Sequence, residues 1–206
     1  MFDCYTGFKW IAAIIRGLEG KMRYLGGGEE SFGFLAQDFV RDKDSVSAIS
    51  LMAEIAAWAK DKGLNMYQML KEIYLKYGFS KEEGISVVRK GKSGAEEILA
   101  IMKNFRENPP KEIAGAPVTI VKDYSTLECK DCTTGKVSKL DMPVTSNVLQ
   151  YFTADETKVS IRPSGTEPKI KFYLEVKGTM NSIEDYDKAN AAAAEKLAQI
   201  KKQLGI

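Results

Sequence analysis

Residues 170 to 176 alternate strictly between apolar and polar side chains, and this alternation constrains the fold more than any other segment. The apolar positions are Ile170, Phe172, Leu174 and Val176. Since successive side chains of a strand point to opposite faces of a sheet, the pattern predicts a strand with one buried and one open face. Such strands are typical of antiparallel sheets, because parallel sheets are covered on both faces.

The residues that precede and follow this strand predict a complete α+β domain. Strands are expected at 85–88, 117–121, 148–152 and 158–161, and helices at 93–106 and from Ser182 onward. A capping box, in which Ser93 and Glu96 bond to backbone N–H groups, would open the first of these helices. The order β-α-β-β-β-β-α therefore predicts an antiparallel sheet with helices on one face.

The first eighty residues have a different pattern, with helices expected at 6–20, between Asp44 or Ser45 and Gly63, and at 66–77. The middle helix is apolar on more than one side, which predicts burial on most sides. Only 22–25 resembles a strand in this part. A helix-rich piece with one strand predicts a partial α/β domain. The polar segment 79–84 is the predicted boundary, which gives domains 1–80 and 81–206.

Composition excludes several classes of function. The chain has no histidine, so a Ser-His-Asp triad, a Cys-His pair and a His-ligated zinc are impossible. Its 30 basic and 28 acidic residues give a net charge of +2, which does not indicate a nucleic-acid or membrane partner. The three cysteines, Cys4, Cys129 and Cys132, are too few for a disulfide framework and favour a cytoplasmic location.

The loop at 162–169 has the chemistry of an oxyanion site. Arg162 offers a planar fork that matches two phosphate oxygens, Ser164 and Thr166 offer hydroxyls, and Gly165 lets backbone N–H groups approach. Lys171 adds positive charge if it points to the same side. The alternative is a polar hairpin turn, since Pro, Ser and Gly are turn residues. A turn alone does not require so many donors, so we predict phosphate binding.

A second loop, 27–33, carries two glycines followed by acidic residues. Carboxylates such as Glu29 accept hydrogen bonds from hydroxyl pairs, and Ser31 can donate or accept, which is how proteins hold sugars. A solvated acidic loop is the alternative. Lys43, in a charged cluster before a helix, and Lys9, in a helix start, indicate little by themselves.

Four segments in this order resemble the carboxy-terminal portion of the α-D-phosphohexomutases, the phosphoglucomutase/phosphomannomutase family. They are Thr6-Gly7-Phe8-Lys9, Gly28-Glu29-Glu30-Ser31, Lys43 within Asp-Lys-Asp, and Arg162-Pro-Ser-Gly-Thr166. The resemblance implies the end of a third, sugar-recognising domain followed by a fourth, phosphate-binding domain. It also implies two sets of site residues: Glu29, Ser31, Lys43 and Lys9 for the sugar, and Arg162, Ser164, Gly165, Thr166 and Lys171 for its phosphate.

Family enzymes interconvert hexose 1-phosphate and 6-phosphate through a hexose 1,6-bisphosphate, with a phosphoserine and Mg²⁺. The chain contains neither a Ser-His phosphoserine motif nor an Asp-Gly-Asp-x-Asp metal loop. We therefore expect a substrate-binding half that is inactive alone, with no catalytic residue and no metal ligand. The sugar phosphate remains open between glucose, mannose and pentose. The alternative is a non-catalytic sugar-phosphate-binding or protein-interaction module that self-associates through an apolar face.

Overall fold

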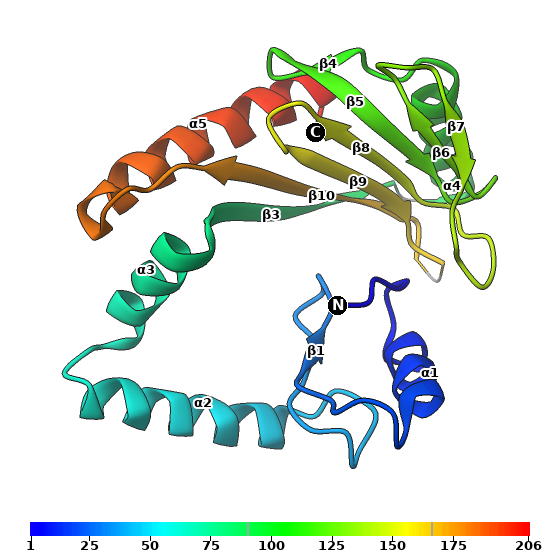
Figure 1. The fold of residues 1–206 in the computed structure, drawn as a ribbon. Helices are drawn as coiled ribbons and strands as arrows, with labels where there is room; N and C mark the ends of the chain where they lie inside the picture. Colours follow the sequence, from blue (N-terminus) through cyan, green and yellow to red (C-terminus); the bar gives the residue numbers. More distant parts are fainter. Residues whose placement is uncertain (90, 166) are drawn as a thin grey trace. The chain divides into compact units, whose positions relative to one another are not determined.

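The computed structural model describes residues 1–89, 91–165 and 167–206, with the side chain of Lys92 left out. Internal contacts divide the chain into two compact units, Met1–Glu72 and Ile73–Ile206 (Figure 1). None of the described helices is long and apolar enough to cross a membrane.

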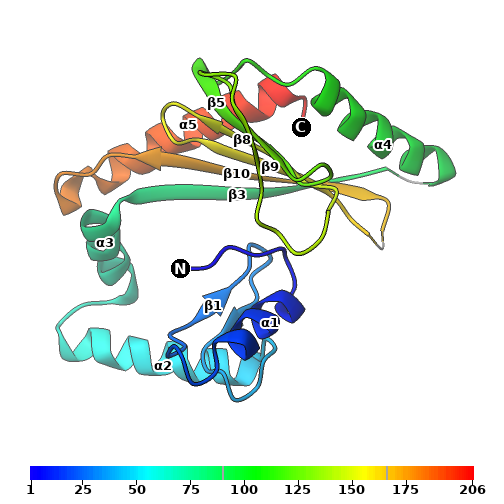
Figure 2. The ribbon, with the colours of Figure 1, turned by 45° about the vertical axis from the view of Figure 1, so that its right-hand side comes forward.

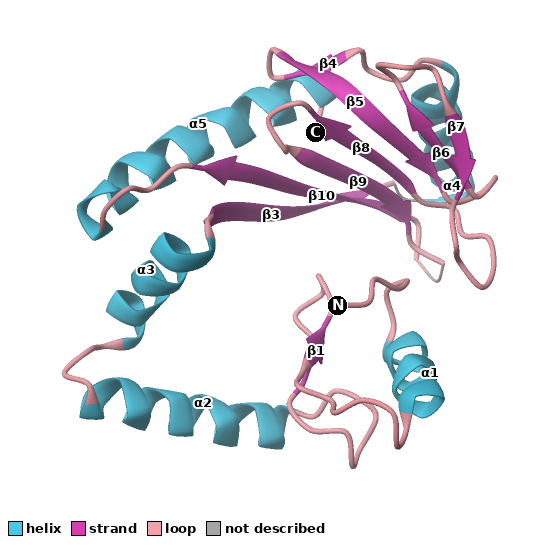
Figure 3. Ribbon diagram, viewed as in Figure 1, coloured by secondary structure: helices cyan, strands magenta, loops and turns pink. Residues whose placement is uncertain are grey.

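An eight-stranded antiparallel sheet is the largest element in the described part of the second unit (Figure 3). Its order is β3-β10-β9-β8-β5-β6-β7, with β4 paired to β5. The strands are β3 (Phe79–Val88), β4 (Glu112–Ile113), β5 (Ala116–Asp123), β6 (Glu128–Asp131), β7 (Val137–Lys139), β8 (Leu149–Thr153), β9 (Lys158–Pro163) and β10 (Lys169–Gly178). This confirms the antiparallel sheet that the sequence predicts.

Two helices, α4 (Gly91–Glu107) and α5 (Tyr186–Leu204), cover one face of this sheet (Figure 2). A short 3-10 turn, Ile183–Asp185, precedes α5 and carries a capping box between Ser182 and Asp185. The apolar positions of β10 point toward the helices and are fully buried. They pack in one core with Met102 of α4 and Leu197 of α5. The opposite face of the sheet carries polar side chains such as Gln150, Ser160 and Lys171, together with Phe152.

Two local predictions in this unit are wrong. Residues 79–84 are not an irregular segment, because they are the first six residues of β3 and pair with β10, whereas the domain limit predicted there stays a prediction. Two of their three charged side chains reach α5, where Lys81 Nζ donates to Asn190 Oδ1 and Lys201 Nζ donates to the Glu83 carboxylate. Polar residues with partners of this kind do not give an apolar alternation. The capping box is also wrong, since α4 begins at Gly91 and places Ser93 inside the helix.

The first unit holds α1 (Phe8–Leu18), β1 (Gly27–Gly28), β2 (Phe34–Leu35) and α2 (Ser45–Asp61), followed by α3 (Met66–Tyr77). Its small core consists of Phe8, Ile15 and Leu35 with Ile11 and Tyr24 packed against it. The strand predicted at 22–25 does not form; instead Tyr24 donates a hydrogen bond from its hydroxyl to the Leu35 carbonyl at 2.8 Å. A two-residue pair of β1 and β2 takes its place.

The helix α2 begins as predicted but is not buried as predicted. The Asp44 carboxylate accepts hydrogen bonds from the Val46 and Ser47 N–H groups, which makes it the N-cap. These bonds lower the pKa of Asp44. Yet Ala59 is the one residue of α2 that is fully buried among the described residues. Most of this apolar helix is therefore exposed within the described structure.

Candidate functional site

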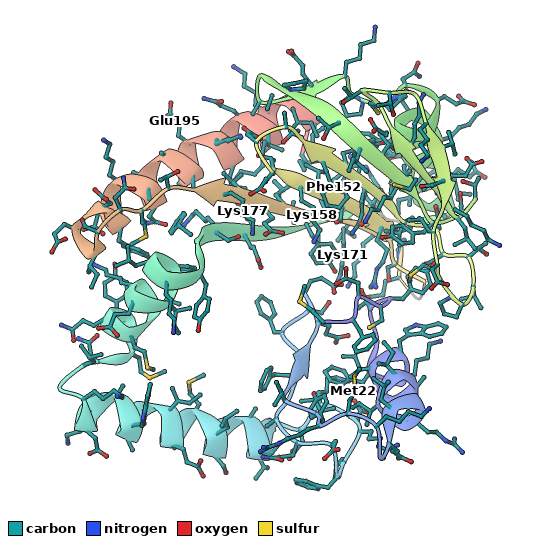
Figure 4. The ribbon with its side chains drawn as sticks, viewed as in Figure 1. Met22, Phe152, Lys158, Lys171, Lys177 and Glu195 are labelled. Atoms are coloured by element: carbon teal, nitrogen blue, oxygen red, sulfur yellow. The ribbon has the colours of Figure 1, made fainter. Side chains whose placement is uncertain are left out.

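The predicted phosphate loop lies between β9 and β10. The strand register places Arg162 and Lys171 side by side next to the loop, and we call these two residues its basic rim. Arg162 and Lys171 are direct cross-strand partners, and Ser86 of β3 is the partner of Lys171 on its other side. Direct partners in an antiparallel pair point to the same face of the sheet. The row Ser86–Lys171–Arg162 therefore lies on the open face, where Figure 4 also shows Lys171 and Lys158, away from α5.

Backbone hydrogen bonds hold the loop closed. The Ser164 N–H donates to the Lys169 carbonyl at 2.8 Å, and the Glu167 N–H donates to the Ser164 hydroxyl at 3.3 Å. The Arg89 N–H, at the end of β3, donates to the Pro168 carbonyl at 2.9 Å. These bonds restrain the described residues on either side of Thr166, which reduces the entropy that those residues lose on binding a ligand.

The charges around the loop are predominantly positive. Lys169 forms an ion pair with Glu167 at 2.5 Å, and the hydrogen bond from Lys169 is the main reason that the pKa of Glu167 is lowered. The positive charge of Lys171 acts on the same carboxylate. Gly165 has no described atom within 4 Å of the position of an added Cβ, so this part of the loop is open. Thr166 lies outside the described residues.

A second polar row crosses the open face next to this rim. Tyr173 is the cross-strand partner of Ser160, which in turn faces Gln150 of β8. The Gln150 side-chain amide donates to the Ser160 hydroxyl at 3.0 Å. Sequence reasoning missed both Ser86 and Tyr173. The sequence did contain a signal for Tyr173. It follows Lys171 by two residues in the same alternating strand, so the two side chains are expected on the same face of the sheet.

In the first unit, the predicted sugar loop is held against the start of α1. The Gly7 N–H donates to Glu29 Oε2 at 2.8 Å, and the Thr6 hydroxyl donates to Glu30 Oε1 at 2.6 Å. Within the loop, the Glu29 N–H donates to the Gly33 carbonyl at 2.9 Å. Segment 6–9 and the acidic loop 27–33 are therefore joined in one local structure.

Phe8 joins these segments to Lys43. Its ring is 5% exposed and lies beside Gly33, and Lys43 Nζ is 5.5 Å from the ring centroid. Lys9 is exposed, with its Nζ 4.8 Å from the centroid of the Trp10 ring. Three of the segments predicted to contact a sugar therefore meet around one buried aromatic ring, and Ser31 is half-buried in the loop beside it.

The magnesium ion that the resemblance implies does not fit the described residues. No group of three or more acidic, cysteine or histidine side chains lies close enough among them to hold a metal ion. Cys4, Cys129 and Cys132 are free thiols. We therefore assign no metal-dependent step to the residues that the structure describes.

Fold and loops define a mixed α/β chain in which an antiparallel sheet carries a basic loop at a strand end. Residues 1–77 match the family profile "Phosphoglucomutase/phosphomannomutase, alpha/beta/alpha domain III", and residues 85–193 match "Phosphoglucomutase/phosphomannomutase, C-terminal domain". The chain belongs to the phosphoglucomutase/phosphomannomutase family and comprises part of domain III and domain IV.

Curated relatives support this assignment. A phosphoglucomutase of Staphylococcus aureus is 40% identical over 175 residues, which is 85% of this chain and 31% of the relative. One of Staphylococcus epidermidis is 38% identical over 172 residues, 84% of this chain and 31% of the relative. The chain thus spans about a third of the length of these relatives. A solved Paramecium structure, pp63/parafusin (phosphoglucomutase), has 18% identity and a TM-score of 0.49, covering 95% of this chain and 34% of that one.

Proposed function

We propose that the chain is the substrate-binding part of a phosphohexomutase, which interconverts hexose 1-phosphate and 6-phosphate through a bisphosphate. The observation that carries the proposal is the direct pairing of Arg162 with Lys171 beside a closed loop, inside the segment that matches domain IV. A phosphate dianion needs both a fork of donors and a nearby point charge, and Arg and Lys supply these two features.

The acidic loop serves the sugar. A carboxylate has more acceptor sites than one backbone N–H group occupies, so Glu29 can bond Gly7 and still accept from sugar hydroxyls. Ser31 lies in the same loop, Lys43 lies beside the Phe8 ring, and Lys9 lies at the start of α1. The partner is a small sugar phosphate. In a mutase, the intermediate presents either of its phosphates to the Arg162 loop while these residues hold the sugar in either orientation.

The chain contributes positioning to the reaction. Phosphoryl transfer needs a nucleophile, neutralisation of charge, and alignment, and the residues found here supply alignment. By resemblance, the phosphoserine and the Mg²⁺ loop belong to other domains of such enzymes, so we expect no turnover from the chain alone. We take 1–80 and 81–206 as the domain limits and the cytoplasm as the location, which the sparse cysteines support.

A titration of the isotope-labelled chain with glucose 1-phosphate, followed by backbone amide shifts, tests the proposal. We expect saturable shifts at the Glu29 loop and the Arg162 loop, and shifts at the Arg162 loop alone with inorganic phosphate. Arg162→Ala abolishes the amide shifts at the Arg162 loop, both with glucose 1-phosphate and with inorganic phosphate. Lys139→Ala, on the far edge strand β7, is the matched control and leaves them unchanged. Absence of shifts at both loops with millimolar ligand overturns the proposal.

A further inference from the structure

Lys171 differs from two other lysines on the open face of the sheet. Lys158 and Lys177 both form ion pairs with Glu175, and all three lysines are labelled in Figure 4. Among the described residues, Lys171 forms no ion pair. Its ammonium lies over an aromatic ring instead, with Nζ 5.9 Å from the centroid of Tyr173. Lys171 is therefore held by a ring where its neighbours are held by a carboxylate.

The difference between a ring and a carboxylate matters at an anion site. A carboxylate positions an ammonium group but cancels its charge, so the pair attracts a further anion only weakly. The face of an aromatic ring attracts a cation through its quadrupole and carries no net charge. The ammonium of Lys171 thus keeps its whole charge at the basic rim, beside Arg162.

The position of the Tyr173 ring follows from the sheet register. Tyr173 and Lys171 are two residues apart in β10, so both side chains lie on the open face. The partner of Tyr173 on β3 is Gly84, which has no side chain. A β-carbon on Gly84 would be 3.8 Å from Tyr173 Cδ1, in ordinary contact with the ring. The ring therefore lies over Gly84, and its surroundings in the sheet keep it half-buried.

We propose that Tyr173 is a positioning residue of the phosphate site, whose ring holds the Lys171 ammonium beside Arg162 with its charge available to a phosphate dianion. The inference rests on the proposed function, which assigns Lys171 to the phosphate. A lysine side chain is flexible, and a ring that restricts it before the ligand arrives reduces the freedom lost on binding. Gly84 contributes indirectly, because a larger side chain there takes the space of the ring.

The test measures the affinity of the full chain for inorganic phosphate from amide shifts in the 162–169 loop. Tyr173→Leu removes the ring but keeps an apolar side chain, and we expect binding to weaken about two- to fivefold. Tyr173→Phe keeps the ring and the wild-type affinity. Phe152→Leu is the matched control. It removes a ring whose centroid is 5.0 Å from Lys122 Nζ, on the same face but two strands from β10, and it leaves the affinity unchanged.

A double-mutant cycle separates positioning from a general effect on the sheet. In a chain that already carries Lys171→Ala, Tyr173→Leu causes no further loss of phosphate affinity, because the ring acts through the ammonium. Losses that simply add overturn the proposal. Gly84→Val displaces the ring without removing it and weakens binding as Tyr173→Leu does, which provides a second route if the leucine variant is not folded by circular dichroism.

A measurement without ligand distinguishes this inference from the proposed function. The ring current of Tyr173 moves the proton signals of the Lys171 Cε methylene upfield, and this displacement is lost in Tyr173→Leu and kept in Tyr173→Phe. Equal signals in the wild type and Tyr173→Leu overturn the proposal, as does wild-type phosphate affinity in Tyr173→Leu. If the displacement is present but the wild-type chain binds no phosphate, the contact stands and the failure lies in the proposed function.

Discussion

The ring of Phe8 lies so close to Gly33 that a β-carbon on Gly33 would be 2.5 Å from the ring carbon Cε2. The same β-carbon would be 2.9 Å from Glu29 Oε1. Gly33→Ala therefore displaces the acidic loop from α1, and we expect a loss of about 1–3 kcal/mol in the local stability of this region. Amide hydrogen exchange of residues around the loop measures it.

The matched control for that substitution is Gly17→Ala. Gly17 lies in α1, and no described atom is within 4 Å of its added Cβ. Alanine in a helix is favoured over glycine by about 0.8–1 kcal/mol, so this variant keeps or raises the protection. Equal loss of protection in both variants contradicts the close contact between Phe8 and Gly33.

Gly94, near the start of α4, is a second position where an added methyl group is expected to lower stability. A β-carbon on Gly94 would be 2.2 Å from the Arg89 carbonyl oxygen, which cannot move without disturbing the bond from Arg89 to Pro168. We expect Gly94→Ala to lower the free energy of unfolding by about 2 kcal/mol or more. Ser93→Ala, next to it and exposed, changes the free energy by less than about 0.5 kcal/mol. Urea denaturation compares the two, and a similar cost for both argues against the observed start of α4.

The register of β10 predicts which lysine contributes to anion binding. Lys171 pairs with Arg162 beside the loop, whereas Lys177, on the same open face, forms an ion pair with Glu175. We expect Lys171→Ala to weaken inorganic phosphate binding about two- to tenfold, since one nearby charge is lost. Lys177→Ala leaves the affinity within experimental error. Amide-shift titrations at low salt measure both, and a larger effect at Lys177 contradicts the assignment.

The turn between β8 and β9 predicts a pH-dependent contribution to stability. Burial acts to raise the pKa of Asp155, but hydrogen bonds from Lys196, Thr153 and Thr157 outweigh it and lower the pKa to about 2 from 3.8. The ionised carboxylate therefore stabilises the fold above about pH 4, and this contribution is lost as the pH falls toward 2. Since the Asp155 side chain is 46% exposed, solvent screening limits the effect to about 1 kcal/mol at neutral pH.

Asp155→Asn removes this contribution. We expect its free energy of unfolding to be lower than that of the wild type near pH 7, and we expect most of this difference to be lost near pH 2. Asp141→Asn, at an exposed carboxyl after β7, follows the wild-type curve throughout. Urea titrations at several pH values measure the difference. A gap between Asp155→Asn and the wild type that is as large at pH 2 as at pH 7 contradicts the role of the carboxylate.

Sequence reasoning identified strands where one face is buried and failed where polar residues have specific partners. The alternation from Ile170 to Val176 predicted β10, because each apolar position lies in the core. Residues 79–84 were not predicted as part of a strand, because their polar residues Lys81 and Glu83 are stabilised by Asn190 and Lys201 of a helix that is distant in the sequence. The hairpin strand β7 has three exposed residues, so no pattern of burial marks it.

The candidate site was predictable as residue types but not as an arrangement. Arg162 and Lys171 were both named from the sequence, yet their pairing depends on the register between β9 and β10, which the residues do not specify by themselves. Phe8 was named from the sequence only as one position of the segment Thr6-Gly7-Phe8-Lys9. Its place between Gly33 and Lys43 follows from packing between segments far apart in the chain.

The ladder between β3 and β10 joins the first strand of the second unit to its last, from Phe79 with Gly178 to Val88 with Lys169. On a ribosome, β3 emerges long before its partner and waits as an unpaired edge until β10 has been made. Pairing across so long a stretch of chain is slow to form. A nascent chain therefore completes the row Ser86–Lys171–Arg162 only after β10 has left the ribosome, although Arg162 and Lys171 can already pair in the local hairpin of β9 and β10.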